Sequence, residues 1–354
     1  MSGLSPSGLP SPGPPSSVDA KSRLAPGGLT VLKNVIILLR VLIQMGVSDQ
    51  DSKARRREFL QTLAAVGAGA AASSYGISQF RLADTGTVLD RLWMFGSPVN
   101  SDYEYVHQRS VMTAVEANFY FGVPNVIMVQ DHPGHSPDSS FKAWEPPFEQ
   151  YALPLRLLKR IEWSVVGGGG VTKGWETHQV LAMAHRTPNF VGIYMDDFFR
   201  DKAEGKGKLA TFTPDELQAL QQRLKGSEKK LDLNVTLYTY QLNPSIADHL
   251  AVIDKVTLWT WKSAELANLD RNLSTLRKLA PKARIMLGCY LVEYDEGASI
   301  PIPAMQHQCE LGFERLRDGQ IEGMVFIGNT VMDLGFEAVE WTREWIQKVG
   351  ETRL

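Results

Sequence analysis

The sequence has little of several features that mark specialised classes of protein. Two cysteines among 354 residues exclude a disulfide scaffold and any zinc site built from cysteine alone. The 37 Lys+Arg and 39 Asp+Glu residues give a net charge of -2, so the charge balance gives no indication of nucleic-acid binding. No apolar run reaches the ~20 residues of a membrane-spanning helix, and we expect no stable membrane span. The hydrophobic fraction of 44% and the charged fraction of 21% are those of an ordinary globular protein.

The beginning of the chain is rich in proline, serine and glycine. Six of the 19 prolines fall within residues 1–26. A segment of this composition cannot bury enough apolar surface to offset the entropy that it would lose on ordering. An apolar stretch follows, and Met45 then offers a second plausible start of translation. We therefore expect residues 1–44 to be low-complexity and disordered, or to lie upstream of the true start.

A second segment has the pattern of an export signal. Residues 52–61 contain paired arginines, one polar residue and Phe-Leu, and an uncharged, alanine-rich stretch follows over residues 62–72. This order resembles a twin-arginine signal peptide, which we place at residues 45–75. The resemblance implies a bacterial protein that folds in the cytoplasm and is carried by the twin-arginine export machinery. The expected destination is the periplasm or the cell exterior.

Residues 76–354 alternate between apolar, β-branched runs and stretches with helical spacing, the first of which is a predicted helix over Glu104–Phe121. Eight runs are predicted to be strands: Leu92–Pro98, Asn125–Gln130, Ile161–Val166, Phe190–Met195, Asn234–Tyr240, Lys255–Trp261, Arg284–Leu291 and Gly323–Ile327. Strands that alternate with helices indicate a parallel sheet, and a (β/α)₈ barrel needs about 250 residues. No glycine-rich dinucleotide fingerprint follows the first run, so an open Rossmann sheet has no support. We predict an α/β fold, a single-domain (β/α)₈ TIM barrel.

The working residues of such a barrel lie at the carboxyl ends of its strands and in the loops that follow. Because side chains alternate along a strand, the fourth run points Tyr194 and Asp196 toward the barrel interior. The same alternation predicts these inward side chains on the next three runs: Thr236, Tyr238, Tyr240, Thr257, Trp259, Trp261, Gly288 and Tyr290. The predicted mouth is therefore aromatic, with a carboxylate at its rim.

An aromatic mouth with polar groups suits a polyhydroxylated ligand. Sugars stack their C–H faces on tryptophan and tyrosine, while amides and acids bind their hydroxyls. The candidate substrate-binding residues are Gln130, Tyr194, Tyr240, Trp259, Trp261, Tyr290 and Asn329. The expected partner is a carbohydrate or another small polar substrate.

Asp196 is the first candidate for catalysis. Glycoside hydrolysis needs two carboxyl groups about 5–10 Å apart across the scissile bond. The second carboxyl group should come from another strand, and Glu293 after the seventh run is the choice. Glu293 shares a strand face with Leu291, so it reaches the mouth only if the strand has already ended. Glu176 and Asp131 are held in reserve.

Three neighbouring features receive structural interpretations. Adjacent strand residues point to opposite faces, so Asp197 is expected to cap a helix or to pair with Arg200 rather than to join Asp196. The glycine run at residues 167–170 is interpreted as a flexible loop. Cys289 and Cys309 could touch, and buried free thiols are the default expectation, although an exported protein could form a disulfide.

The end of the fourth run, Trp259-Thr260-Trp261 and the late Glu293 together resemble the glycoside hydrolase superfamily of (β/α)₈ barrels. The resemblance lies in the architecture and covers roughly residues 90–348. It implies a glycosidase-like hydrolase that uses carboxylates, Asp196 and Glu293, at the carboxyl end of the barrel. It implies no cofactor.

Two alternatives from other classes remain open. Asp131, His132 and His135 could bind a divalent metal in a metal-dependent TIM-barrel hydrolase, lyase or isomerase that acts on a small molecule. A non-catalytic sugar-binding protein is the other alternative, because an aromatic platform binds sugar without an acid pair. Facing carboxylates, clustered imidazoles or a shallow aromatic groove would distinguish the three.

Overall fold

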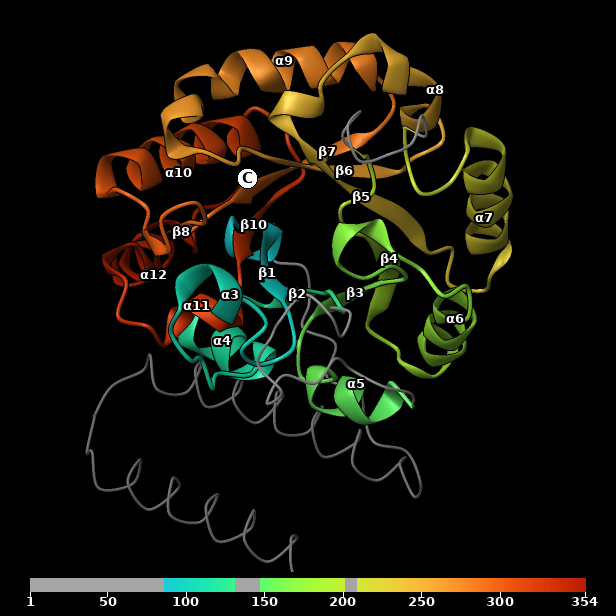
Figure 1. Cartoon of the computed structure of the whole chain (residues 1–354), viewed down its shortest axis with the longest axis horizontal. Helices are drawn as coiled ribbons and strands as arrows, with labels where there is room; N and C mark the ends of the chain where they lie inside the picture. The colour runs from blue at the N-terminus through green and yellow to red at the C-terminus, as the bar shows by residue number, and fades with distance from the viewer. Residues whose placement is uncertain (1–85, 131–146, 201–208) are drawn as a thin grey trace, which may run out of the picture. The chain divides into compact units, whose positions relative to one another are not determined.

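A computed structural model of the chain describes residues 86–130, 147–200 and 209–354, and in it the predicted TIM barrel is confirmed (Figure 1). Eight parallel strands close in the order β1-β10-β7-β6-β5-β4-β3-β2. Their bounds are Leu92–Gly96 (β1), Asn125–Met128 (β2), Arg160–Ser164 (β3), Phe190–Met195 (β4), Asp232–Tyr238 (β5), Lys255–Trp259 (β6), Arg284–Cys289 (β7) and Gly323–Ile327 (β10). A two-stranded antiparallel hairpin, Val292–Glu293 (β8) and Ala298–Ser299 (β9), follows β7. All eight predicted strands are present, most of them shorter at the carboxyl end than predicted.

Helices surround the barrel (Figure 1). Their bounds are Tyr103–Val106 (α3), Ala114–Phe121 (α4), Glu149–Leu155 (α5), Glu176–Arg186 (α6), Pro214–Gly226 (α7), Ala247–Leu250 (α8), Leu269–Leu279 (α9), Ile302–Arg317 (α10), Asn329–Met332 (α11) and Glu337–Val349 (α12). Local sequence sets several of these boundaries. Thr113 with Glu116 and Thr213 with Glu216 each form a reciprocal capping box at the start of α4 and α7, and Pro214 occupies the first turn of α7.

The strands are buried on both faces, which is why they appear in the sequence as continuous apolar runs. Side-chain contacts across the interior confirm the predicted inward alternation. The hydroxyl of Tyr194 on β4 meets that of Thr236 on β5 at 2.6 Å, and Trp259 on β6 donates to Tyr194 at 3.5 Å. Gly288 on β7 lies directly against the Trp259 ring. These contacts form a packed layer beneath the carboxyl ends of the strands.

The amino ends of the strands are closed by a network of charges. The ammonium of Lys255, whose side chain is 3% exposed, lies 2.8 Å from Glu162, 3.2 Å from Asp232 and 3.4 Å from Glu322. Arg284 bridges Asp232 and Glu322 from the rim at 2.7 and 3.1 Å. Burial alone would lower the pKa of Lys255, but the three acids raise it above its usual value. The network therefore stays charged and holds four strands together at their amino ends, which form the floor of the barrel.

Two further expectations concern the thiols and the membrane. Cys289 and Cys309 are both buried free thiols, and burial raises the pKa of each. Within residues 86–130, 147–200 and 209–354, no helix is long and apolar enough to cross a membrane. The predicted signal at residues 45–75 and the segment 1–44 lie outside the described residues.

Candidate functional site

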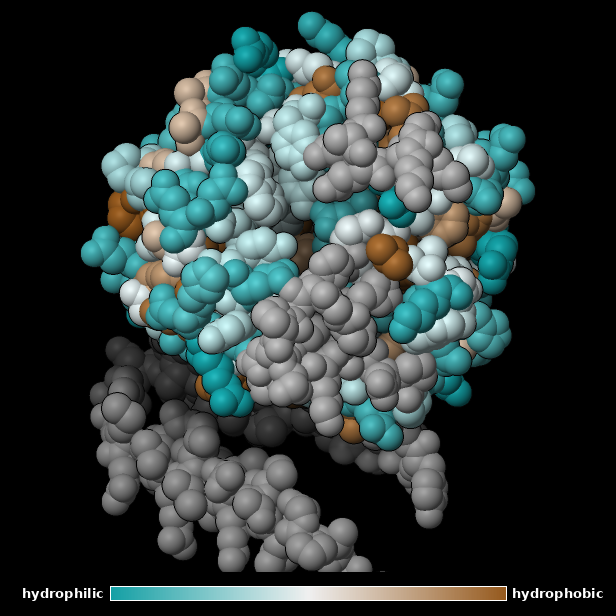
Figure 2. Space-filling model, viewed as in Figure 1, coloured by the Kyte–Doolittle hydropathy of each residue, from teal (hydrophilic) through white to brown (hydrophobic). Residues whose placement is uncertain are grey.

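A cavity of about 320 Å³ opens at the carboxyl ends of the barrel strands. The space-filling view shows this face hollowed near its centre, with mostly hydrophilic surroundings (Figure 2). Four carboxylates line it: Asp102, Glu104, Asp196 and Asp197. Seven aromatic side chains share the lining: Phe95, Tyr105, Tyr238, Trp259, Trp261, Tyr290 and Tyr294. The predicted aromatic mouth with a carboxylate at its rim is therefore found in one cavity, which holds three further acids.

Asp196 and Asp197 both line this cavity, which corrects the expectation that they face opposite ways. Strand β4 ends at Met195, and Asp197 adopts a left-handed backbone conformation with φ of 44°. Strand alternation no longer applies in such a turn, so two consecutive side chains can reach the same space. Asp197 starts no helix, and among the described residues it forms no ion pair with Arg200.

The Asp197 carboxylate is fixed from both sides. The Tyr238 hydroxyl donates to Oδ1 at 2.6 Å, and the backbone N–H of Gly169 donates to Oδ2 at 2.8 Å. Gly169 belongs to the 3₁₀ turn Gly168–Gly170 (η2), where Gly169 and Gly170 both have positive φ. A Cβ on Gly170 would lie 2.5 Å from the Asp197 carbonyl oxygen. The glycine run is thus required for this close approach, and its role is to position Asp197.

Asp196 is oriented by a chain of hydrogen bonds that begins in the packed layer below. Trp259 Nε1 donates to the Tyr194 hydroxyl at 3.5 Å, and the Tyr194 hydroxyl is 2.6 Å from Thr236 Oγ1. Thr236 in turn donates to Asp196 Oδ1 at 2.8 Å. Burial first, and then the charge of Asp196, raises the pKa of Tyr194, so its phenol stays protonated. Tyr194 is fully buried and supports Asp196 from beneath the cavity.

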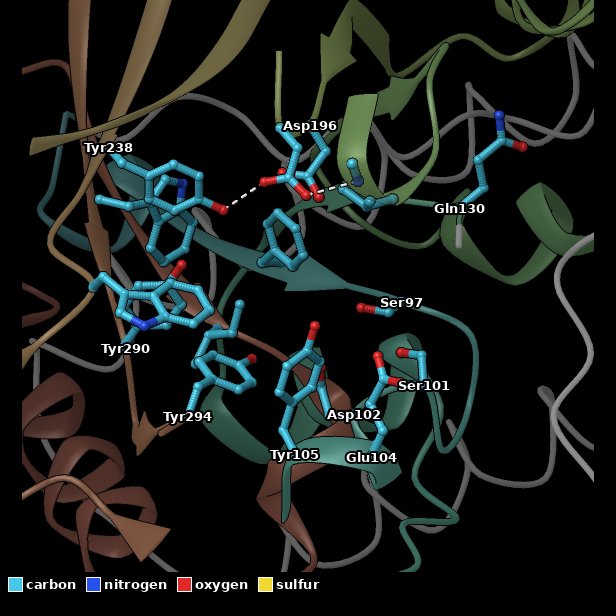
Figure 3. A pocket seen from close by; sticks show the side chains of 17 residues that line it. Ser97, Ser101, Asp102, Glu104, Tyr105, Gln130, Asp196, Tyr238, Tyr290 and Tyr294 are labelled. Atoms are coloured by element: carbon cyan, nitrogen blue, oxygen red, sulfur yellow. Dashed lines mark hydrogen bonds between the residues drawn. The ribbon is translucent and has the colours of Figure 1, made fainter. Parts of the chain in front are cut away.

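Two acids that the sequence interpretation did not single out face this pair. Asp102 and Glu104 come from the start of α3, in the loop after β1, and Figure 3 shows them across the cavity from Asp196. Asp102 accepts a hydrogen bond from the Thr330 hydroxyl. Glu104 forms no hydrogen bond or ion pair with the described residues. The sequence interpretation included residue 104 in one long helix; its position just after a barrel strand is the signal that could have identified it.

The aromatic wall is continuous. Trp261 stacks on Tyr294 with centroids 5.3 Å apart, and Trp259 contacts Tyr290 at 4.8 Å. Burial is the largest cause of the raised pKa of Tyr290, and the charges of Asp197 and Asp196 add to it. The phenol therefore remains a hydrogen-bond donor at any physiological pH, beside the two aspartates.

The other predicted site residues are distributed as follows. Gln130 lines the cavity, and its buried amide nitrogen has no partner among the described residues. Tyr240 lies beyond the end of β5, is 54% exposed and stacks on Tyr238 with centroids 5.3 Å apart. Asn329 does not line the cavity, because its buried amide is bonded to backbone groups of Ser97 and Met112. It fixes the loop after β1.

Glu293 and Glu176 lie outside the cavity. Glu293 is on the β8 hairpin and accepts a hydrogen bond from the backbone of Ser263 at 3.4 Å, so the structure does not bring it together with Asp196. Glu176 is buried, and its carboxylate accepts hydrogen bonds from the Thr172 hydroxyl and from the backbone N–H of Lys173 in the loop before α6. Asp131, His132 and His135, the alternative metal ligands, lie outside the described residues. Among the residues that the structure describes, no three His, Cys, Asp or Glu side chains are grouped to hold a metal ion.

Comparison with known proteins gives no family. No family model and no curated protein matches the chain. Solved structures resemble the chain only at low sequence identity. An α-L-fucosidase candidate from Bacteroides thetaiotaomicron is 11% identical over 75% of this chain and 98% of its own, with a TM-score of 0.48. A zinc-bound amidohydrolase from Burkholderia multivorans is 14% identical over 75% and 92%, with a TM-score of 0.48. A chitinase domain from Pyrococcus furiosus is 11% identical over 68% and 84%, with a TM-score of 0.43. No reaction is assigned from likenesses this distant.

Proposed function

We propose that the protein is a carbohydrate-active enzyme of the glycoside hydrolase type, and that its reaction takes place in the cavity above the barrel. The observation that carries the proposal is the placement of carboxylates from two separate elements on opposite sides of one aromatic cavity (Figure 3). Glycoside hydrolysis needs such a pair, one group to protonate the leaving oxygen and one to act on the other face of the sugar. Tyrosine and tryptophan rings supply surfaces on which a sugar ring stacks.

The environments of the carboxylates suggest their roles. Asp196 is held by Thr236 at 2.8 Å, and its neighbour Asp197 by Tyr238 and Gly169. A fixed carboxylate of this kind suits attack on the anomeric carbon, or stabilisation of the positive charge that develops there. Glu104, without a partner in the described part of the chain, is free to give and take a proton. We assign Asp196 as nucleophile or base, and Glu104, in place of Glu293, as the acid.

A screen of nitrophenyl glycosides with the purified chain tests this proposal. Asp196→Asn and Glu104→Gln should each lower turnover about 10²-fold or more, the scale of a positioned acid or base. Glu293→Gln is the matched control, because it removes an acid of the same size outside the cavity, and it should leave turnover unchanged. If the glycoside that is cleaved is still cleaved at the full rate by both cavity variants, the reaction lies elsewhere. If no glycoside is cleaved at all, the proposal of hydrolysis fails.

We also propose that the protein is exported. The support is the sequence of residues 52–72, in which paired arginines precede an uncharged, alanine-rich stretch. Replacing Arg56 and Arg57 with lysine should retain the protein in the cytoplasm of a bacterial host, because the export machinery recognises the arginine pair. Fractionation of cells that express the two forms measures this, and an unchanged periplasmic yield would contradict it.

A further inference from the structure

The cavity continues past Asp197 into a second hollow of about 650 Å³. The two share four lining residues, Gly169, Asp197, Tyr238 and Trp261, so the fixed carboxylate lies at their boundary. The second hollow adds cationic side chains, Arg200 and Lys262, that the first lacks. A ligand that extends across Asp197 would therefore contact an aromatic cavity on one side and a charged one on the other.

Arg200 has an unusual environment for an arginine. Its backbone is fixed, since its N–H donates to the carbonyl oxygen of Leu209 at 2.9 Å, beside the bridge between Phe199 and Ala210. Its guanidinium forms no hydrogen bond or ion pair with the described residues, and its Nε is buried without a partner. Among all described lysines and arginines, this is the one buried side-chain nitrogen in that state. A buried donor on a permanently charged group is costly to leave unpaired.

The other charges around the hollow do not neutralise Arg200. Lys262 is paired with Asp295 at 3.0 Å, and Trp261 Nε1 also donates to Asp295 at 3.0 Å. Glu265 is the remaining acid of the lining, and it forms no side-chain hydrogen bond or ion pair with the described residues. The Asp197 carboxylate already accepts two hydrogen bonds, from Tyr238 and Gly169. Arg200 thus presents a fork of donors with no acceptor among the described residues.

We propose that the second hollow binds an anionic sugar unit, one that carries a carboxylate or a sulfate group, and that Arg200 binds this group. The inference rests on the proposed function and specifies its substrate class. A planar guanidinium binds a carboxylate or sulfate through paired N–H···O bonds, which adds orientation as well as affinity. Tyr240, at the edge of the same hollow, is 54% exposed and offers an aromatic ring to the sugar. The scissile bond then lies beside Asp197, between the anionic unit and the sugar in the first cavity.

Equilibrium binding separates this inference from the catalytic proposal. The probes are a tetrasaccharide that contains glucuronate, the same tetrasaccharide with its carboxyl groups reduced to alcohols, and that reduced form carrying sulfate. Calorimetry with the full chain should show at least 10-fold tighter binding of a charged form than of the neutral one, weakened by added salt. Comparing the affinity of the glucuronate probe with that of the sulfated probe shows which anion is preferred.

Substitutions of Arg200 test whether this side chain binds the anionic group. Arg200→Gln should weaken binding of the charged probe about 10–100-fold, the range of a charge-assisted pair, and Arg200→Lys should restore only part of it. Arg271→Gln, an exposed arginine on α9, is the matched control and should bind as the original chain does. Equal binding of charged and neutral probes, or charged binding unaffected by Arg200→Gln, would overturn the inference even if neutral glycosides are hydrolysed. Arg200-dependent binding without any hydrolysis would instead uphold the anion site and refute the hydrolase.

Discussion

Gly288→Ala would add one methyl group at the most crowded position of the barrel interior. The new Cβ would lie 2.1, 2.3 and 2.6 Å from three ring atoms of Trp259, far inside van der Waals contact. The indole has little room to move, because it is 1% exposed, packs edge-on against Phe95 at 5.6 Å and lies tilted against Tyr290 at 4.8 Å. Overpacking of this kind typically costs about 1–3 kcal/mol, and we expect the upper end of that range.

The same displacement should reach the site. Trp259 donates to Tyr194, which is hydrogen-bonded to the threonine that holds Asp196, so a shifted indole breaks the first bond of that chain. Urea unfolding measures the stability loss, and a loss of 2–3 kcal/mol corresponds to a fall in Tm of roughly 4–12 °C for a domain of this size. The tryptophan fluorescence of the folded variant should change as well, because the Trp259 indole is displaced.

A matched control separates the clash from a general effect of alanine. A Cβ on Gly226, in the last turn of α7, meets no atom within 4 Å, so Gly226→Ala should be neutral or slightly stabilising. Adding Trp259→Phe to Gly288→Ala should return part of the lost stability, since the smaller ring leaves room for the methyl group. A Gly288→Ala variant within about 0.5 kcal/mol of the original chain would refute the packing argument.

The remaining predictions concern charges and one hydrogen bond. Lys255→Met should cost about 3–5 kcal/mol in urea unfolding, because it leaves Glu162, 1% exposed, without its ion pair; a loss under about 1 kcal/mol would contradict this. Burial raises the pKa of Asp232, but Lys255 and Arg284 more than offset this and lower it from 3.8 to about 2. Its stabilisation, at most about 2 kcal/mol, is therefore present above pH 4 and lost between pH 4 and 2, so the deficit of Asp232→Asn at pH 7 should disappear over that range; a deficit that persists at pH 2 would count against it. Tyr238→Phe removes the 2.6 Å hydrogen bond to the Asp197 carboxylate. It should reduce glycoside turnover about 10-fold with little loss of stability, and unchanged turnover would show that the bond is dispensable.

The sequence predicted the barrel because its strands are buried on both faces, and such strands are easily recognised as eight apolar runs. Alternation then identified Trp259, Tyr290 and Asp196 in the cavity, because each lies on a regular strand or directly after one. It failed where the strand had ended. Asp197 joins Asp196 through a left-handed turn, and Tyr240 lies on a 3₁₀ turn rather than on β5. The exact residue at which ladder hydrogen bonding stops depends on neighbouring strands, which a local pattern does not contain.

Asp102 and Glu104 were missed for a related reason. The predicted helix over residues 104–121 is two helices, α3 and α4, with an irregular segment between them. Helical spacing alone does not distinguish a helix that packs beneath the mouth from a single turn that borders it. Glu293 shows the reverse error: it follows a barrel strand, but the β8–β9 hairpin holds it away from the cavity.

The charged floor of the barrel has a consequence for engineering. The buried ion pairs around Lys255 lie at the amino ends of the strands, whereas the proposed catalytic and anion-binding side chains lie beyond the carboxyl ends, with the Tyr194 and Trp259 layer between them. Substitutions at distant sites without shared partners add nearly independently. Loops at the mouth could therefore be exchanged to change specificity in a version of the scaffold whose floor has first been stabilised. Stability and specificity can therefore be evolved in separate rounds on this barrel.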